Sequence, residues 1–437
     1  MSKKILILST GDLNGAYEAM YKVAHILKNM GHEVVMCVKY KTKNEEFIKA
    51  YSHQSSVPAN PGLLRTITNK FKAKLTTASS SQAKKNFSTD SKYSFLSKDE
   101  LSENINVESL IKTVGFTPNF IFTGMTIDFL NSTDLLNIYN ATQAKIFNIT
   151  VDMNHFTGGC HFSWGCEGYI RGCDEKCPAI IEADEKVIAK NNFDRKYENA
   201  QKANFQIIAG SGLTFTQTQN SKIYKDQKTI HNINSLIDTK LLNDKNKSIA
   251  KRIFSLSDDY FYILTGAQNM EDPRKGFSYL LDALKILDKE LPIELKEKIV
   301  LLVVSNTVNE EFDQVTFKKQ KIDYIKDYRL LALLYQAADI FINSSIEDSG
   351  PMMVSEALAC GTPVVGFDTG VVTNMVIDDY NGYKAPVKDS RKLAEGIRKI
   401  FELSKDSYTV FSKNAVRQVQ EFSSYEYAER IFSKILE

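Results

Sequence analysis

Short apolar runs alternate with longer stretches of helical period along most of the chain. The first run, Lys4–Ser9, has an aliphatic centre, and a turn at Thr10–Gly15 follows it. Residues Ala16–Met30 place apolar side chains three or four positions apart, which predicts an amphipathic helix. Gly31 ends that helix, and Glu33–Val38 is apolar again. A strand, a helix and a second strand in this order predict the opening of a doubly wound α/β domain.

The same alternation returns later in the chain. We expect further strands at Asn119–Thr123, Ala144–Val151 and Phe205–Ala209, and the first domain ends near Thr229–Ile237. A polar connection, Asn243–Lys251, leads into a second series. That series is predicted to hold strands and helices at Tyr260–Gly266, Phe277–Asp288, Ile299–Ser305, Asp327–Ala338, Asp339–Asn343, Pro351–Cys360, Pro363–Phe367 and Ser423–Leu436. Two α/β halves predict an intervening cleft, with ligands beyond the carboxyl ends of the strands.

One segment, residues 53–93, interrupts the pattern. It is rich in Ser, Thr, Lys and Asn, and from Pro61 to Tyr93 it holds seven Lys or Arg against one Asp. One interpretation is a mobile surface insertion. The other is a basic amphipathic helix, Leu63–Leu75, that lies on an anionic membrane surface.

Composition narrows the class of protein. The chain has 437 residues, of which 43% are hydrophobic and 25% charged, as in soluble globular proteins. A net charge of +2 gives no general support for nucleic-acid binding. The apolar runs are too short to span a bilayer, and the first is too short for a signal peptide. We therefore expect a cytoplasmic protein.

Four of the six cysteines crowd into one loop, residues 155–178, with the spacing C-x5-C-x6-C-x3-C. In a cytoplasmic chain such a cluster is not expected to be a disulfide framework. Two interpretations stay open: reduced thiols packed in a loop, or four ligands of a structural Zn²⁺. The candidate ligands are Cys160, Cys166, Cys173 and Cys177.

The stretch that carries most chemistry runs from Glu347 to Val365. It predicts a loop, a short helix starting around Gly350, Pro351 and Met352, and a strand. A helix start presents free backbone N–H groups, so it attracts phosphate. Asp348 and Glu356 flank this start, and carboxylates bind hydroxyl groups by charge-assisted hydrogen bonds. Phosphate together with many hydroxyls describes a nucleotide-sugar.

Several ordered blocks carry a specific resemblance. The second half is similar to the donor-binding domain of retaining family 4 glycosyltransferases of the GT-B fold, through Asp272–Phe277, Ala337–Ser345, Glu347–Asp348, Glu356–Val365 and Asn381–Tyr383. Asp152–Met153, Phe156–Ser163 and the later cysteines resemble a subgroup that makes colanic acid and capsular polysaccharides. The resemblance implies transfer of a hexose from a UDP- or GDP-sugar to a glycan, with retained configuration and no catalytic metal. It also implies an acceptor domain over residues 1–238, a donor domain over 239–420 and a final helix over 421–437 that packs back on the first domain.

The resemblance assigns roles to residues of the second half. Arg274 and Lys275 would hold the donor diphosphate, whose negative charge grows as the glycosidic bond breaks. Glu356 would bind the ribose. Asp348 would lie near the donor sugar, and the adjacent Glu347 is the alternative for that contact.

Other expected contacts are less closely matched to the family. Gly15 and Asn14 lie at the first strand-to-helix turn, where the family approaches the donor phosphates or the acceptor. The base pocket is expected to hold Tyr324, Ile325 and Tyr328.

A departure from the family pattern concerns histidine. Relatives often have a sugar-binding His where this chain has Val151, so we consider His155 and His161 as replacements. Asp152 is a candidate for binding acceptor or sugar hydroxyls. We favour a front-face route, in which the leaving phosphate takes the acceptor proton.

The expected partners are a nucleotide-sugar and a glycan or lipid-linked acceptor, with no nucleic acid. The basic insertion would suit the inner face of the plasma membrane. Two other functions share the architecture: a nucleotide-sugar epimerase, and a non-catalytic nucleotide-binding sensor of metal or redox state.

Overall fold

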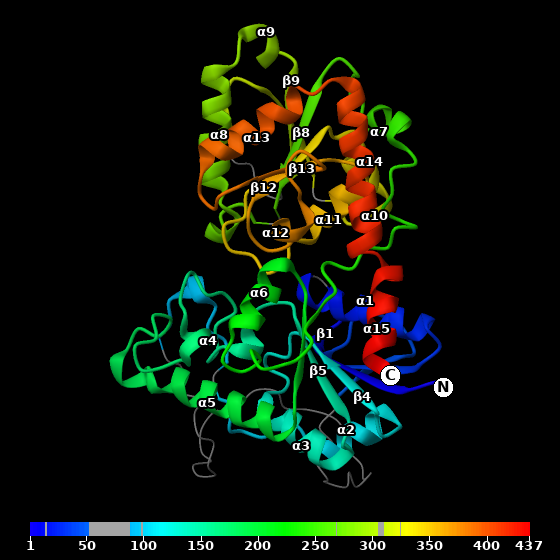
Figure 1. Ribbon diagram of the computed structural model, residues 1–437, viewed down its shortest axis with the longest axis vertical. Coiled ribbons are helices and arrows are strands. Elements are labelled where there is room, and N and C mark those ends of the chain that lie inside the picture. Colours follow the sequence, from blue (N-terminus) through cyan, green and yellow to red (C-terminus); the bar gives the residue numbers. More distant parts are fainter. Residues whose placement is uncertain (14, 52–87, 98, 268, 305–309, 324) are drawn as a thin grey trace, which may run out of the picture.

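The chain folds into two α/β domains stacked one above the other (Figure 1). The computed structural model describes residues 1–13, 15–51, 88–97, 99–267, 269–304, 310–323 and 325–437. Asn14, Tyr324 and the proposed basic helix Leu63–Leu75 lie outside the described residues. Among the described residues, no helix combines the length and hydrophobicity needed to cross a membrane.

The N-terminal domain is built on a seven-stranded parallel sheet of order β3-β2-β1-β4-β5-β6-β7. Its central strands are buried along nearly their whole length because helices cover both faces. The strands are β1 Lys4–Gly11, β2 Glu33–Tyr40, β3 Ile48–Ala50, β4 Phe120–Thr123, β5 Lys145–Thr150, β6 Gln206–Ala209 and β7 His231–Asn232.

Helices cover the two faces of this sheet with separate cores. On one face, α1 (Gly15–Asn29) packs Met20, Val23 and Leu27 against the strands. The other face is covered by α2 (Val107–Val114), α3 (Ser132–Thr142) and α5 (Val187–Lys202). Of two shorter helices, α6 (Gly212–Asn220) lies at the boundary with the second domain, and α4 (Gly168–Arg171) lies at the left of the first domain in Figure 1.

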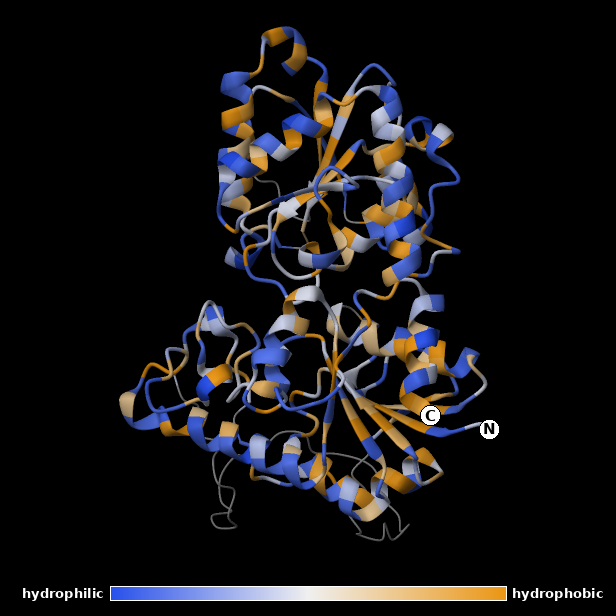
Figure 2. Cartoon of the chain, in the orientation of Figure 1, coloured by the Kyte–Doolittle hydropathy of each residue, from blue (hydrophilic) through white to orange (hydrophobic). Residues whose placement is uncertain are grey.

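The C-terminal domain repeats the plan with a six-stranded parallel sheet of order β10-β9-β8-β11-β12-β13. Its strands are β8 Phe261–Gly266, β9 Ile299–Val304, β10 Lys318–Ile322, β11 Ile340–Asn343, β12 Val364–Phe367 and β13 Gly382–Ala385. The helices are α7 Lys247–Ile253, α8 Phe277–Glu290, α9 Ile293–Lys296, α10 Tyr328–Ala337, α11 Met352–Ala359, α12 Val372–Met375, α13 Ser390–Phe401 and α14 Lys405–Phe422. Figure 2 shows apolar strands inside and polar residues on the outer helices of both domains. The expected pair of doubly wound sheets is confirmed.

The chain crosses between the domains twice. After α14, the last helix α15 (Tyr425–Leu436) returns to the first domain and lies beside α1 (Figure 1). The two crossings run side by side, because Ile237 N donates to Ser423 O at 2.8 Å and Tyr425 N donates to Ile237 O at 3.2 Å. Phe432 of α15 is fully buried and meets Phe122 of β4 edge-to-face.

One detail of the expected helix start is wrong. Pro351 does not occupy the first helical turn; it is the N-cap residue with extended backbone angles, and α11 begins at Met352. The reason is visible in the loop before it, where Gly350 N bonds back to the Asp348 carboxylate and turns the chain.

Candidate functional site

The two domains contact each other through loops around the start of α11. Gly350 lies close to the first domain, since a Cβ on it would be 3.7 Å from Gly210 O. Asn374 makes a second contact: its Oδ1 accepts from Gly212 N at 3.0 Å, and its Nδ2 donates to Asn234 Oδ1 at 2.7 Å. Residues of both domains therefore line the region where the sequence placed the donor.

Lys275 and Asp348 form the centre of this region. Lys275 ends a 3₁₀ turn, Pro273–Lys275, and its Nζ lies 2.6 Å from Asp348 Oδ2. The other oxygen of Asp348 accepts from Gly350 N at 3.1 Å. An ammonium group thus stands beside the backbone N–H groups at the start of α11, an arrangement suited to a diphosphate.

Glu356 follows one turn later on α11 and is 3% exposed. Its Oε2 accepts from the Tyr335 hydroxyl at 2.9 Å. Burial raises the pKa of this carboxyl, while Lys22 of the first domain and Tyr335 pull it down. The ribose-binding role that the resemblance implied stays a prediction.

Arg274 is held differently from Lys275. Its guanidinium donates from Nε to Asp272 Oδ1 at 3.1 Å and stacks 4.1 Å from the ring of Phe162, a residue of the first domain. Arg274 therefore joins the two domains as well as adding positive charge to the site.

Glu347 is also engaged by the first domain. Its Oε1 accepts from the backbone N–H groups of Ser163 at 3.0 Å and Trp164 at 3.2 Å. Burial raises the pKa of Glu347, and these two N–H groups offset part of the effect. Of the two adjacent carboxylates, Asp348 is thus the one beside Lys275, and Glu347 holds the cysteine-rich loop.

The first domain contributes a buried Asp152–His161 pair just beyond β5. His161 Nδ1 lies 2.7 Å from Asp152 Oδ2, and Asn154 N donates to Asp152 Oδ1 at 2.8 Å. Burial alone would raise the pKa of Asp152, but His161 and the Asn154 N–H bring it below its ordinary value. His161 Nε2 is buried and has no hydrogen-bond partner among the described residues, so this ring orients Asp152 rather than facing solvent.

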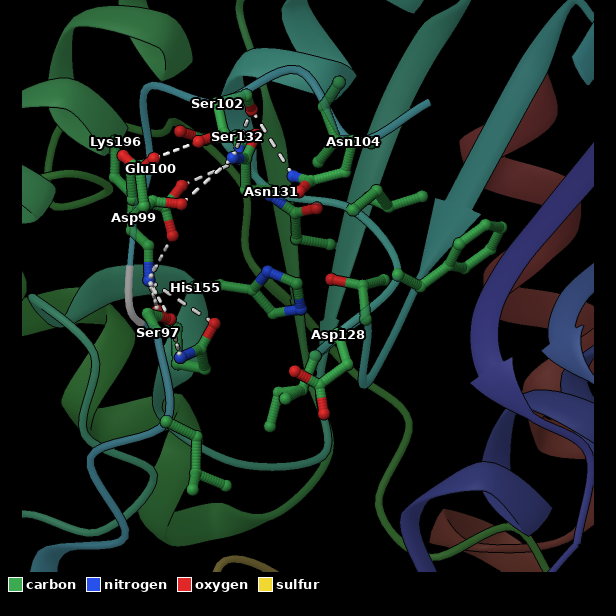
Figure 3. Close-up of a pocket in the computed structure, with 18 of the residues that line it drawn as sticks. Ser97, Asp99, Glu100, Ser102, Asn104, Asp128, Asn131, Ser132, His155 and Lys196 are labelled. Atoms are coloured by element: carbon green, nitrogen blue, oxygen red, sulfur yellow. Dashed lines mark hydrogen bonds and ion pairs between the residues drawn. The ribbon is translucent and has the colours of Figure 1, made fainter. Parts of the chain in front are cut away.

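His155 lies on the other side of the same loop. Its Nε2 is 2.9 Å from Gly124 O, and burial lowers its pKa to about 4, so the ring is neutral at pH 7. It lines a cavity of about 560 Å³ within the first domain. Figure 3 shows His155 between Asp128 and a group formed by Asp99, Glu100 and Lys196.

The other described residues that the sequence predicted for the site do not lie in one cluster. Gly15 begins α1 with a positive φ of 48°, and a Cβ there would meet nothing within 4 Å. Ile325 packs at the edge of the second domain's core, and Tyr328 is partly exposed at the start of α10. Tyr328 lies within electrostatic reach of Tyr335, which binds Glu356.

All four clustered cysteines gather in one small core. The thiols of Cys160 and Cys177 share a hydrogen bond, and Cys173 Sγ accepts from Gly158 N at 3.2 Å. Cys177 also accepts from the N–H groups of Ala179 and Ile180. Across the described part of the chain, no three His, Cys, Asp or Glu side chains converge as a metal ion requires. The structural zinc stays a prediction.

Residues that the sequence analysis missed bridge the domains. Phe162, Ser163 and Trp164 follow His161 directly and reach Arg274 and Glu347. Phe162 and Ser163 belong to the segment that carried the resemblance, and Trp164 follows it. An aromatic ring and two backbone N–H groups do not mark a residue as functional in the sequence.

Comparison with known proteins assigns the second domain. Residues 246–418 match the family model described as glycosyl transferases group 1. These residues are therefore similar to group 1 glycosyltransferase domains. An uncharacterized glycosyltransferase of Methanocaldococcus jannaschii is 27% identical over 158 residues, which is 34% of this chain and 39% of that protein. The match thus spans about two fifths of that relative's length.

Solved structures are similar to this chain over nearly its whole length. Sucrose-phosphate synthase from Thermosynechococcus elongatus has a TM-score of 0.65 at 16% identity, over 99% of this chain and 98% of that one. HepE of Anabaena, in complex with UDP and glucose, has a TM-score of 0.60 at 14% identity over 99% of both chains. These similarities confirm the GT-B fold.

Proposed function

We propose that this chain is a retaining glycosyltransferase that moves a hexose from a UDP- or GDP-sugar to a carbohydrate acceptor. The observation that carries the proposal is the contact between Lys275 and Asp348 at the start of α11, with Glu356 one turn later. The start of α11 lies between Asp348 and Glu356 in the chain, as the diphosphate of a nucleotide-sugar lies between its sugar and its ribose. The matching group 1 domain and the UDP bound by HepE support the same class of donor.

The proposed reaction uses no protein nucleophile. The protein stabilises the charge of the leaving group and positions the two substrates. As the glycosidic bond breaks, negative charge gathers on the leaving diphosphate, and Lys275 with the N–H groups of α11 stabilises it. The leaving phosphate then takes the proton of the attacking hydroxyl on the same face. No metal is required for this step.

The acceptor is proposed to enter from the first domain. Its pocket offers the carboxylate of Asp128, the neutral ring of His155 and the ammonium of Lys196, which suit a polyhydroxylated ligand. The oriented Asp152 lies beside His155 and would bind a sugar hydroxyl. A surface polysaccharide or a lipid-linked oligosaccharide fits this chemistry, and the second would bring the protein to the inner face of the plasma membrane.

The test is incubation with UDP-glucose, UDP-N-acetylglucosamine and GDP-mannose in EDTA, followed by chromatography of nucleotides and sugars. We expect release of UDP or GDP with at least one donor, and loss of this release in Glu356→Ala. The product formed with an acceptor should keep the donor's anomeric configuration in its NMR spectrum. Conversion of one nucleotide-sugar into another, or nucleotide binding without release, would contradict the proposal.

A further inference from the structure

The pocket of the first domain carries more negative than positive charge. Among the described residues of its wall, Asp99, Glu100 and Asp128 are acidic and Lys196 is basic. His155 adds no charge at pH 7, because burial lowers its pKa to about 4. The cavity volume of about 560 Å³ lies within the usual range of small-molecule sites, about 300 to 1,000 Å³. The charge of this wall therefore bears on which ligand the pocket accepts.

Lys196 brings no unbalanced positive charge to the pocket. Its Nζ lies 3.4 Å from Glu100 Oε1 and donates to Asn154 O at 2.7 Å. The other carboxylate oxygen of Glu100 accepts from Ser132 N at 2.9 Å. Lys196 and Glu100 are both buried, with 5% and 3% of their surface exposed. This ion pair stabilises the wall and is neutral as a unit.

The two remaining carboxylates of the wall differ in their surroundings. Asp99 is held by its own turn, since its Oδ1 accepts from Leu101 N at 2.8 Å and its Oδ2 accepts from the Ser102 hydroxyl. Asp128 is exposed in the loop after β4, and its carboxylate makes no hydrogen bond or ion pair with a described residue. Lys39 of β2 donates to the backbone oxygen of Asp128, not to its carboxylate. The carboxylate of Asp128 is therefore available to a ligand.

His155 presents a second acceptor to the pocket. Its Nε2 is 2.9 Å from Gly124 O, and a carbonyl oxygen only accepts, so the neutral ring carries its proton on Nε2. Nδ1 is then an acceptor, and it has no hydrogen bond to a described residue. Figure 3 shows this ring in the pocket, between Asp128 and the group formed by Asp99, Glu100 and Lys196.

Two groups that only accept hydrogen bonds select a ligand that donates them. Sugar hydroxyls and ammonium groups donate to a carboxylate and to an imidazole nitrogen. An ionised carboxylate or phosphate has no proton to donate at neutral pH. Its charge would also be repelled by Asp128, and the described wall offers no unbalanced cation to offset that repulsion.

We propose that this pocket binds an uncharged or amino sugar of the acceptor through hydrogen bonds to Asp128 and His155 Nδ1, and that it rejects acidic sugars. This inference rests on the proposed function, because it identifies the ligand of the pocket with the acceptor. Asp128 is then a specificity-determining residue: its charge separates sugars that have the same ring but different substituents.

The experiment measures binding of a matched panel of sugars to the full chain by saturation-transfer NMR at low ionic strength. The panel holds the methyl glycosides of glucose, galactose and mannose, each as the neutral sugar, the 2-amino sugar and the uronic acid. A pH of about 6.5 keeps the carboxylates ionised and the amines charged. In at least one ring series, we expect the uronic acid to bind roughly five- to tenfold more weakly than the neutral sugar.

Asp128→Asn tests the assignment of this preference. Asparagine tolerates the left-handed backbone of this residue, whose φ is 59°, and Asp128→Gly is the second variant if Asp128→Asn does not fold. The substitution should shrink the uronic-acid penalty to about twofold or less, and remove any advantage of the amino sugar. Asp282→Asn is the matched control, because Asp282 is exposed on α8 of the second domain. His155→Leu should weaken binding of all forms of the ring, since it removes the Nδ1 acceptor.

Three results would overturn the inference. They are uronic acids that bind as tightly as the neutral sugars, the same ratio of the two in wild type and Asp128→Asn, and no binding by any member of the panel. Release of UDP or GDP from the donor is measured on the same preparation. Wild-type protein that releases no nucleotide would instead overturn the proposed function.

Discussion

At the scale of single residues, ion pairs determine how the site at the start of α11 is built. Lys275 reaches Asp348 at 2.6 Å, whereas Arg274 is held by Asp272 and the ring of Phe162. The two adjacent cations therefore have different surroundings, and only Lys275 stands beside a carboxylate at the start of α11.

Lys275→Ala is expected to lower kcat/KM for the donor more than about tenfold, the scale of a lost charged hydrogen bond. The measurement is nucleotide release at varied donor concentration. Lys392→Ala is the control, because Lys392 is exposed and pairs with Glu395 on the surface. Equal kinetics in both variants would remove Lys275 from the site.

His155 should make the first domain sensitive to acid. Its pKa is about 4 in the folded protein and about 6.5 in an unfolded chain. The unfolded state therefore binds more protons between these values, so stability falls as the pH is lowered from 6.5 towards 4. The loss should be on the order of 3 kcal/mol by urea unfolding at pH 4 against pH 7.5.

His155→Gln should remove most of that pH dependence, because glutamine does not titrate. His25→Gln on α1 should keep it. The same slope in wild type and His155→Gln would show that another group is responsible.

The charged residues of the site can be recognised in the sequence, but the partner of each charge cannot. Asp348 and Glu347 are neighbours in the chain, and only the fold shows that one faces Lys275 and the other the N–H groups of Ser163 and Trp164. The burial of Lys22 could not be predicted either, because a lysine in an amphipathic helix is expected to face solvent.

At the scale of elements, a single glycine fixes the turn that presents Lys275. Gly276 has a φ of 60°, and a Cβ there would lie 2.1 Å from Ser344 O. Gly276→Ala should therefore lower the melting temperature and reduce donor use together. Gly165→Ala is the matched control, since Gly165 also has positive φ but open space, and it should cost only about 1 to 2 kcal/mol. Similar losses in the two variants, measured by calorimetry, would contradict this account.

The prediction of a structural zinc concerns the cysteine-rich loop. Its four thiols share one core, and backbone N–H groups already donate to Cys173 and Cys177. The described side chains do not converge as metal ligands, so zinc binding would require the loop to rearrange. If the zinc interpretation holds, elemental analysis of protein purified without added metal should give about one zinc per chain. Cys177→Ser should lose it and Cys37→Ser, on β2, should not. Metal-free protein, or a disulfide joining Cys160 to Cys177, would contradict the prediction.

Elements with a strong hydrophobic pattern were predictable, and those without one were not. The expected strand Ile299–Ser305 corresponds to β9, which is apolar throughout. The neighbouring β10 reads Lys-Lys-Gln-Lys-Ile and lies at the edge of the sheet, where polar side chains face solvent and no alternation is required. The contacts of Phe162 to Trp164 across the boundary could not be predicted, because they depend on how the domains meet.

At the scale of the whole molecule, the last helix ties the two ends of the chain together. Phe432 of α15 is fully buried against β4, so Phe432→Ala should destabilise the first domain by roughly 3 to 5 kcal/mol. Phe422→Ala is the control, because Phe422 is 42% exposed at the end of α14, and its change should stay within about 0.5 kcal/mol. Guanidinium unfolding followed by tryptophan fluorescence and circular dichroism measures both. A small effect of Phe432→Ala would mean that α15 is only loosely attached.

The paired crossings at Ile237 and Ser423 also govern how the molecule can open. A single linker would allow the two domains to rotate and translate freely relative to each other. Two crossings joined by hydrogen bonds should restrict the relative motion of the domains more than a single linker would, and favour rotation about the line of the crossings. Swinging the domains apart would then separate Glu347 from the Ser163 and Trp164 N–H groups and Arg274 from the Phe162 ring at the same time.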